Sequence, residues 1–115
     1  MKARIYHNPR CSKSRATLAL LEQRGLDIEI VEYLKTVPTA GEIRQLLDRL
    51  GLEAADILRQ GEAAFQASGL DRNSPPEALI ALMSQEPIVI ERPIVVIGNA
   101  ARIGRPPERV LELLA

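Results

Sequence analysis

The fold is indicated by residues 2–33, which read KARIYHNPRCSKSRATLALLEQRGLDIEIVEY. Residues 2–6 have the alternating pattern of a short strand. A helix is expected over residues 12–24, because Gly25 supplies the stop signal that commonly follows a helix. Residues 27–33 alternate with period two and predict a second strand. A strand, a helix and a strand within about thirty residues indicate a right-handed parallel β-α-β unit.

The middle of the chain reads as helical. Thr39–Glu42 is a capping box that opens a helix ending before Gly51. Ser74–Glu77 is a second capping box, with proline at the first helical position, and it predicts a helix through Gln85. Two short helical turns are expected between these helices. We interpret this segment, about residues 39–86, as a helical insertion.

The last third of the chain predicts a hairpin and a helix. Residues 92–97 form a strong β run, and Gly98-Asn99 is a turn signal after which residues 100–103 return as the paired strand. Pro106-Pro107 opens a final helix. The predicted order is β-α-β, a helical insertion, then β-β-α. It indicates an α/β class and a single domain over residues 1–115.

Composition excludes several classes of protein. The 115 residues suffice for one domain, and 46% hydrophobic with 26% charged residues excludes a disordered chain. Fifteen basic and fifteen acidic residues give a net charge of zero, which argues against a nucleic-acid partner bound through bulk electrostatics. No apolar stretch approaches the ~18 residues of a membrane span, and the amino terminus lacks a signal-peptide pattern. We expect a cytoplasmic monomer without a membrane partner.

The cysteine and histidine counts limit the chemistry further. Cys11 is the only cysteine, so no intramolecular disulfide forms, and His7 is the only histidine. Two such residues are too few for a typical zinc or transition-metal site. We therefore expect no bound metal or organic cofactor.

Cys11 is the candidate nucleophile. It lies between the first strand and the first helix, where free helix amides and the helix dipole favour a thiolate. His7, Arg10, Lys13 and Arg15 are expected to add positive charge around it. The alternative, an inert buried thiol, is disfavoured because a corner flanked by proline and polar residues is a poor core site.

The residues that follow Cys11 narrow the reaction. The sequence Cys11-Ser12-Lys13-Ser14 is C-x-x-S, so the second thiol of a dithiol redox site is missing. A tyrosine-phosphatase loop would need arginine at position 17, which is Thr17. Disulfide chemistry at this site must therefore be completed by an external thiol.

These motifs resemble those of the glutaredoxin-coupled arsenate reductase family along essentially the whole chain. Residues 103–108, IGRPPE, resemble a shorter, arsenate-reductase-like branch of it. The matching segments are His7–Arg15, Tyr33-Leu34, Ile57–Arg59, Glu91–Val96 and Ile103–Pro106.

The resemblance implies a thioredoxin-like fold and assigns roles to individual residues. It implies that Cys11 is the nucleophile and that His7 favours its thiolate. It also implies that Arg59, Arg92 and Arg105 bind the oxyanion. Guanidinium groups suit this role, because each can bind two oxygens of a tetrahedral anion with charge-assisted hydrogen bonds.

Further residues are expected to support the site. The resemblance implies a cis Arg92-Pro93 peptide, and we expect Pro93, Ser14 and Arg15 to be supporting residues. Arg10 and Lys13 are interpreted as solvated or steering charges.

The implied activity is reduction of arsenate to arsenite, as in arsenic detoxification. A Cys11–arsenate adduct would be attacked by glutathione as co-substrate, and glutaredoxin would resolve the mixed disulfide. One alternative is a thioredoxin-fold regulatory module that docks on RNA polymerase, although many of these carry a C-x-x-C pair and Ser14 argues against it. Another is a monothiol glutaredoxin-like oxidoreductase, which would not require three converging arginines.

Overall fold

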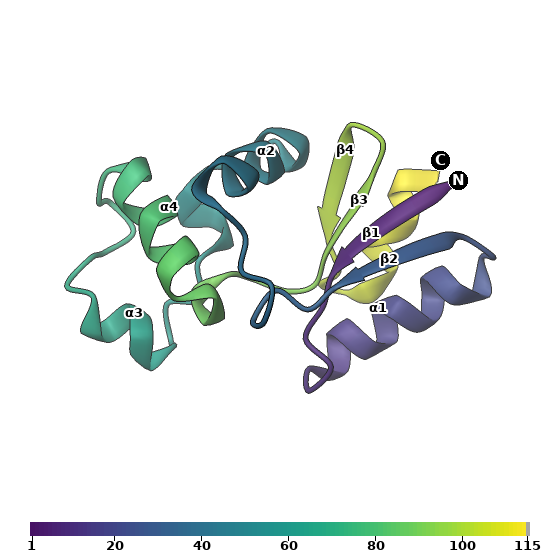
Figure 1. Ribbon diagram of the computed structural model, residues 1–115, viewed down its shortest axis with the longest axis horizontal. Coiled ribbons are helices and arrows are strands. Elements are labelled where there is room, and N and C mark those ends of the chain that lie inside the picture. The colour runs from purple at the N-terminus through teal and green to yellow at the C-terminus, as the bar shows by residue number, and fades with distance from the viewer. Residues whose placement is uncertain (115) are drawn as a thin grey trace. The chain divides into compact units, whose positions relative to one another are not determined.

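The structure, a computed structural model, describes residues 1–114 and divides into two compact units. The first unit combines residues 1–36 with the chain from Arg92 onward, and the second is Val37–Glu91. The predicted helical insertion, about residues 39–86, lies inside the second unit. Figure 1 labels the α-helices and β-strands of both units.

The first unit is a four-stranded sheet with helices packed on it. The strand order is β2-β1-β3-β4, with β1 and β2 parallel and the other two pairs antiparallel. This is the predicted β-α-β unit followed by a hairpin (Figure 1). The second strand is shorter than predicted. The elements are β1 (Lys2–Tyr6), α1 (Ser12–Gln23), β2 (Asp27–Val31), β3 (Ile94–Ile97), β4 (Ala100–Ile103) and a 3₁₀ helix, η3 (Pro107–Leu114).

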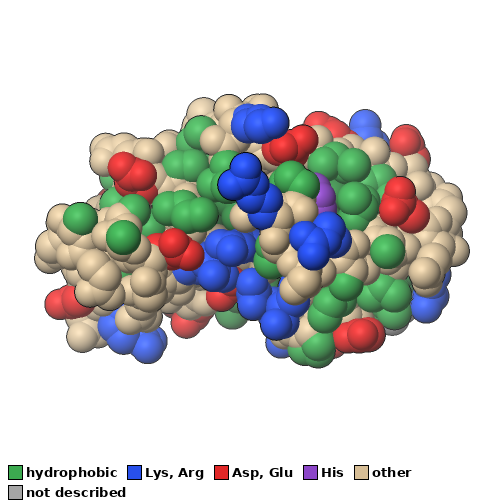
Figure 2. All heavy atoms as spheres, turned by 90° about the horizontal axis from the view of Figure 1, so that it is seen from below, with side chains coloured by type: hydrophobic (Ala, Val, Ile, Leu, Met, Phe, Trp, Pro, Cys, Tyr) green, Lys and Arg blue, Asp and Glu red, His purple; other side chains and the backbone are tan. Residues whose placement is uncertain are grey.

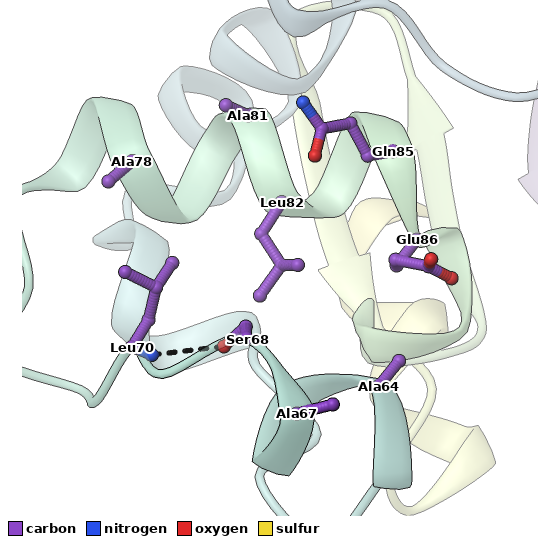
Figure 3. Close-up of a pocket in the computed structure, with 9 residues that line it drawn as sticks. All are labelled: Ala64, Ala67, Ser68, Leu70, Ala78, Ala81, Leu82, Gln85 and Glu86. Carbon is purple, nitrogen blue, oxygen red and sulfur yellow. Dashed lines mark hydrogen bonds between the residues drawn. The ribbon is translucent and has the colours of Figure 1, made fainter.

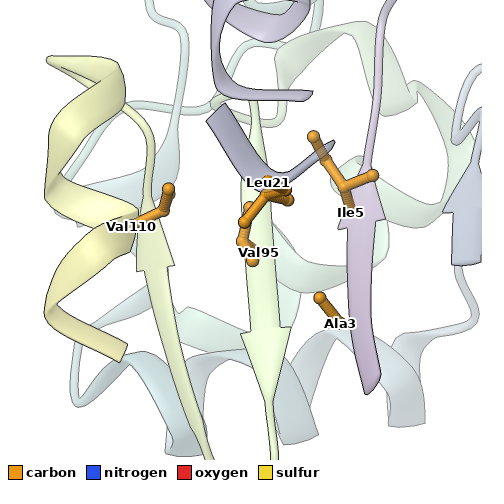
Figure 4. Packing of buried hydrophobic residues seen from close by; sticks show 5 residues of the cluster. All are labelled: Ala3, Ile5, Leu21, Val95 and Val110. Atoms are coloured by element: carbon orange, nitrogen blue, oxygen red, sulfur yellow. The ribbon is translucent and has the colours of Figure 1, made fainter. Parts of the chain in front are cut away.

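The core of this unit lies on one face of the sheet. Leu21 of α1 and Val110 of η3 pack with Val95, Ile5 and Ala3 from the strands, and all five are fully buried (Figure 4). Because α1 and η3 both contribute to this cluster, they cover the same face. The cluster thereby fixes α1, whose first residue follows Cys11, against β1 and β3.

The β3–β4 hairpin places the residues before β3 opposite those after β4. Gly98 makes the turn with φ of 62°, in the left-handed region that glycine adopts at little cost. Ile94 pairs with Ile103, so the chain just before Ile94 faces the chain just after Ile103. The Arg92-Pro93 peptide is cis, as the resemblance implies, and the Arg105-Pro106 peptide is also cis.

The second unit is helical and has a core of its own. Its buried residues include Ile43 and Leu46 from one helix and Leu79 and Met83 from another. The predicted cap at Thr39 is confirmed, since its hydroxyl accepts from the Glu42 amide at 3.1 Å. The elements are α2 (Ala40–Leu50), η1 (Ala54–Ile57), α3 (Ala63–Ala67), α4 (Pro76–Gln85) and η2 (Pro87–Val89).

The predicted capping box at Ser74 is wrong, although a helix does start at Pro76. The residue that caps α4 is Pro75, and no side chain caps it. The Ser74 hydroxyl instead accepts from the Asp71 amide at 2.9 Å, which closes the preceding turn. The Glu77 carboxylate is drawn outward to Arg44, 2.7 Å away. Ser74 and Glu77 therefore bind other partners, and the capping box between them does not form.

No helix within residues 1–114 is both long enough and apolar enough to cross a bilayer.

Two isoleucines paired across β1 and β2 test how far the sheet core stabilises the fold. Ile5 is fully buried, whereas its partner Ile30 is 50% exposed. We expect Ile5→Ala to lower the free energy of unfolding by about 2–5 kcal/mol, because it leaves a cavity in the core. Ile30→Ala should lower it by less than about 1 kcal/mol. Urea unfolding of both variants measures this, and equal losses would contradict the placement of the core.

Candidate active site

Cys11 is the residue that caps the amino end of α1. Its backbone is extended (φ −94°, ψ 123°), its amide donates to the Asn8 carbonyl at 3.0 Å, and its own carbonyl accepts from the Arg15 amide at 3.0 Å. The side chain is partly exposed. The thiol therefore reaches solvent from a backbone that is held on both sides.

The surroundings of the sulfur favour the thiolate. Burial by itself raises the pKa of the Cys11 thiol, but the Ser14 amide, the Arg92 guanidinium and the Lys13 amide donate to the sulfur. The positive charge of Arg92 acts in the same direction. Together they outweigh burial, so the pKa of Cys11 lies below its ordinary value, as its place at a helix amino end predicts.

Two of the three predicted arginines lie beside Cys11. Nη2 of Arg105 is 3.8 Å from the Cys11 Sγ, and Nε of the same side chain donates to the Arg92 carbonyl at 2.8 Å. Arg92 precedes β3 and Arg105 follows β4, so the register of the hairpin brings them together. The site thus holds a cysteine whose pKa is lowered and two guanidinium groups, an arrangement that can bind and attack an oxyanion.

Arg59 belongs to the helical unit, where two carboxylates engage it. Its Nε lies 3.2 Å from Oε1 of Glu62 and its Nη1 lies 2.8 Å from Oε1 of Glu91. Its backbone amide donates to the Val89 carbonyl at 2.7 Å, and its side chain is 23% exposed. The guanidinium is thus held in a defined place within this unit. Its predicted contact with an oxyanion stays a prediction.

His7 is buried and contacts Ser14. The His7 Nδ1 and the Ser14 Oγ are 2.6 Å apart, and the same hydroxyl accepts from the Asn8 amide at 3.0 Å. Burial, with the nearby charge of Arg15, lowers the pKa of His7 despite the opposing charge of Glu32. The lowered pKa disfavours the charged imidazole, which is opposite in direction to the positive charge expected of His7. Its contact is with the Ser14 hydroxyl at the start of α1.

The loop before Cys11 is held by hydrogen bonds that involve the side chains of Arg15 and Asn8. Nη1 of Arg15 donates to the Pro9 carbonyl at 2.9 Å, and the Oδ1 of Asn8 accepts from the Arg10 amide at 3.0 Å. The strand pattern marks Asn8 only as the residue that ends a strand. An asparagine that bonds to the amide two residues on is a common turn device, so its sequence position offered the signal. Arg15 supports the loop, and Arg10 is exposed.

Charged side chains of both signs lie on one face of the molecule. Figure 2 shows Lys and Arg side chains and Asp and Glu side chains both distributed over the face in view, in keeping with a net charge of zero. Within residues 1–114, no three His, Cys, Asp or Glu side chains gather in a way that could hold a metal ion.

A separate cavity of about 470 Å³ lies within the helical unit, between α4 and the α3 region (Figure 3). Its walls are largely alanine and leucine. The Ser68 hydroxyl among them is already used, since it donates to the Phe65 carbonyl and accepts from the Leu70 amide. Gln85 and Glu86 also line the cavity, so its walls carry polar as well as apolar side chains.

The chain is similar to known proteins along nearly its whole length. The model of the ArsC family matches residues 6–113. "Uncharacterized protein YfgD" of Escherichia coli K12 is 49% identical, with 98% of this chain and 97% of that protein covered. An arsenate reductase of Neisseria meningitidis serogroup A is 42% identical, with 96% and 97% covered.

The fold is also that of a solved relative. The structure of an arsenate reductase from Vibrio cholerae superposes with a TM-score of 0.93 at 47% identity and covers 97% of each chain. Together with the strand order, this confirms the predicted thioredoxin-like fold.

The lowered pKa of Cys11 can be measured by its reactivity. We expect the rate of alkylation by iodoacetamide to rise with pH with a midpoint below ~8.5, the ordinary value for cysteine. Arg92→Ala should move the midpoint upward, because the thiolate loses a hydrogen bond and a nearby positive charge. Lys13→Ala is the control, since it keeps the backbone amide and removes only an exposed side chain. A wild-type midpoint at or above ~8.5 would contradict the activation of Cys11.

Proposed function

Because the chain belongs to the ArsC family, we propose that it reduces arsenate to arsenite with Cys11 as the nucleophile. One observation carries this proposal: the sulfur of a cysteine with a lowered pKa lies 3.8 Å from the Arg105 guanidinium and accepts from Arg92. A thiolate is the reactive form of cysteine. Guanidinium groups beside it can hold the oxygens of the anion that the thiolate attacks.

Arg92 and Arg105 are the proposed arsenate ligands in the first unit. Arsenate near neutral pH is a tetrahedral anion with one to two negative charges, and each guanidinium can donate two parallel hydrogen bonds to its oxygens. The positive end of the α1 dipole favours an anion at the same place. The family resemblance assigns a third contact to Arg59, and the ion pairs of this side chain with Glu62 and Glu91 are expected to hold it in position.

The first chemical step forms a bond between sulfur and arsenic. The Cys11 thiolate attacks the arsenic atom of arsenate, and one oxygen leaves, after protonation, as water. The product is a Cys11 thiol–arsenate adduct in which arsenic is still As(V). Arg92 and Arg105 stabilise the charge on the remaining oxygens through this step.

The second step transfers two electrons to arsenic. A glutathione thiolate attacks the Cys11 sulfur, the bond between sulfur and arsenic breaks, and its electron pair stays on arsenic as arsenite. Cys11 and glutathione are thereby oxidised to a mixed disulfide. Because position 14 is serine, no second thiol of this chain follows at C-x-x-C spacing, and a glutaredoxin thiolate is proposed to take the glutathione and release Cys11.

Phosphate has nearly the shape and charge of arsenate and is expected to bind at the same place. The proposed selectivity lies in the chemistry, since thiols reduce As(V) and do not reduce phosphate. Phosphate is therefore a suitable probe of binding without turnover. Glutathione is kept as the free thiol in a reducing cytoplasm, which is the compartment that this reaction requires.

The activity is tested by a coupled assay of arsenate with glutathione, glutaredoxin, glutathione reductase and NADPH. We expect turnover only when glutathione and glutaredoxin are both present, and we expect Cys11→Ser to abolish it, because a serine hydroxyl can neither reduce arsenic nor form the disulfide. Full activity with a dithiol alone would contradict the proposed reductants. No activity under any supply of thiols would favour a regulatory role on the same fold.

The anion site is tested by titration with phosphate. Removal of a charge-assisted hydrogen bond weakens an interaction by roughly 1.5–3 kcal/mol, so Arg92→Ala or Arg105→Ala should weaken binding about ten- to a hundredfold. Lysine at either position should recover only part of this loss, because an ammonium group keeps the charge and loses the paired geometry. Arg10→Ala is the matched control. If it weakens phosphate binding as much as Arg92→Ala, the effect is diffuse electrostatics and the proposed ligands are wrong.

A further inference from the structure

Gly104 lies where the three segments that form the site meet. It is the residue between β4 and Arg105, it is buried, and its amide donates to the Pro93 carbonyl at 2.9 Å. A Cβ placed on Gly104 would lie 2.5 Å from Oγ1 of Thr17 and 2.9 Å from Cγ of Pro93. Thr17 is on α1, nearly two turns after Cys11, and Pro93 directly follows Arg92. Space for a side chain is therefore absent on two sides.

Position 104 requires glycine because there is no space for a Cβ atom, and not because of the backbone conformation. Four other glycines have a positive φ, at positions 25, 51, 69 and 98, and Gly104 is not among them. An alanine could thus adopt its backbone conformation. The obstacles to a Cβ are rigid, because Thr17 is fully buried with its hydroxyl donating to the Lys13 carbonyl at 2.8 Å, and Pro93 is a ring. A Cβ would have to move backbone segments apart.

We propose that Gly104 is a positioning residue, whose missing side chain lets the Arg105 end of β4 lie against α1 and Pro93. This close approach holds Arg92 and Arg105 at the Cys11 sulfur. The Arg105 Nε donates to the Arg92 carbonyl, so the Arg105 side chain is also held to the backbone of Arg92. The consequence for catalysis rests on the proposed arsenate reduction, whereas the consequence for the thiolate and for anion binding does not.

The test is Gly104→Ala, with Gly61→Ala as the control. A methyl group added at Gly61 would meet no neighbouring atom within 4 Å, so the same substitution there should change nothing at Cys11. We expect Gly104→Ala to move the alkylation midpoint of Cys11 upward and to weaken phosphate binding by about tenfold, because both arginines shift from the sulfur. Circular dichroism establishes that each variant is folded. A folded Gly104→Ala protein with the wild-type midpoint and phosphate affinity would overturn the proposal.

A rescue experiment separates positioning from general destabilisation. Thr17→Ala removes the nearest obstacle, so Gly104→Ala combined with Thr17→Ala should recover part of the lost phosphate affinity and part of the midpoint shift. Recovery is expected to be partial because the Pro93 ring remains 2.9 Å from the added methyl group. A double variant no better than Gly104→Ala would overturn the proposal, because relief of the contact would then have no effect.

The experiment also decides the proposal when a variant does not fold. If Gly104→Ala is unfolded, the double variant is compared with Thr17→Ala alone, and equal midpoints and phosphate affinities would overturn the proposal. If the double variant is unfolded too, Gly104 is required for folding and the positioning role is wrong. Neither readout needs arsenate turnover. A wild-type protein that binds phosphate but fails to reduce arsenate would refute the proposed function and leave the result for Gly104 standing.

Discussion

The interaction on which the site depends is the stabilisation of the Cys11 thiolate at the amino end of α1. Partial burial opposes the charged sulfur, and it is overcome because the Ser14 and Lys13 amides and the Arg92 guanidinium all donate to it. Helix amides are fixed donors, since the first turn has no carbonyl partners for them. The sulfur therefore meets a preorganised positive environment before any substrate binds.

The rest of the first unit keeps that environment in place. The cluster of Ala3, Ile5, Leu21, Val95 and Val110 joins α1 to β1 and β3, so the helix that carries the free amides cannot shift relative to the sheet without exposing apolar surface. The hairpin register then aligns the segments that carry Arg92 and Arg105. Gly104 completes this arrangement because it leaves no atoms between the end of β4 and α1.

The structure shows His7 in contact with the first turn of α1. Burial lowers the pKa of the imidazole and so disfavours its charged form. It contacts the hydroxyl of Ser14, the residue whose amide donates to Cys11. This contact, together with the Arg15 bond to the Pro9 carbonyl, ties the loop before Cys11 to the first turn of the helix.

Local patterns in the chain were enough to predict most of its helices and strands and to single out Cys11 as the candidate nucleophile. Strand and helix periods, Gly25, Gly98 and the Thr39 cap act over a few residues, so β1, α1, α2 and the hairpin follow from neighbouring residues alone. The lowered pKa of Cys11 was predictable for the same reason. The Ser74 box failed because the Asp71 amide and Arg44 compete for its members, and Arg44 is distant in sequence. The nearness of Arg105 to a cysteine 94 residues away was implied by the family resemblance and by no local pattern. Two features were visible only after folding: burial lowers the pKa of His7, and Gly104 has no room for a side chain. Each of these depends on contacts and desolvation between segments far apart in the chain, which no local pattern encodes.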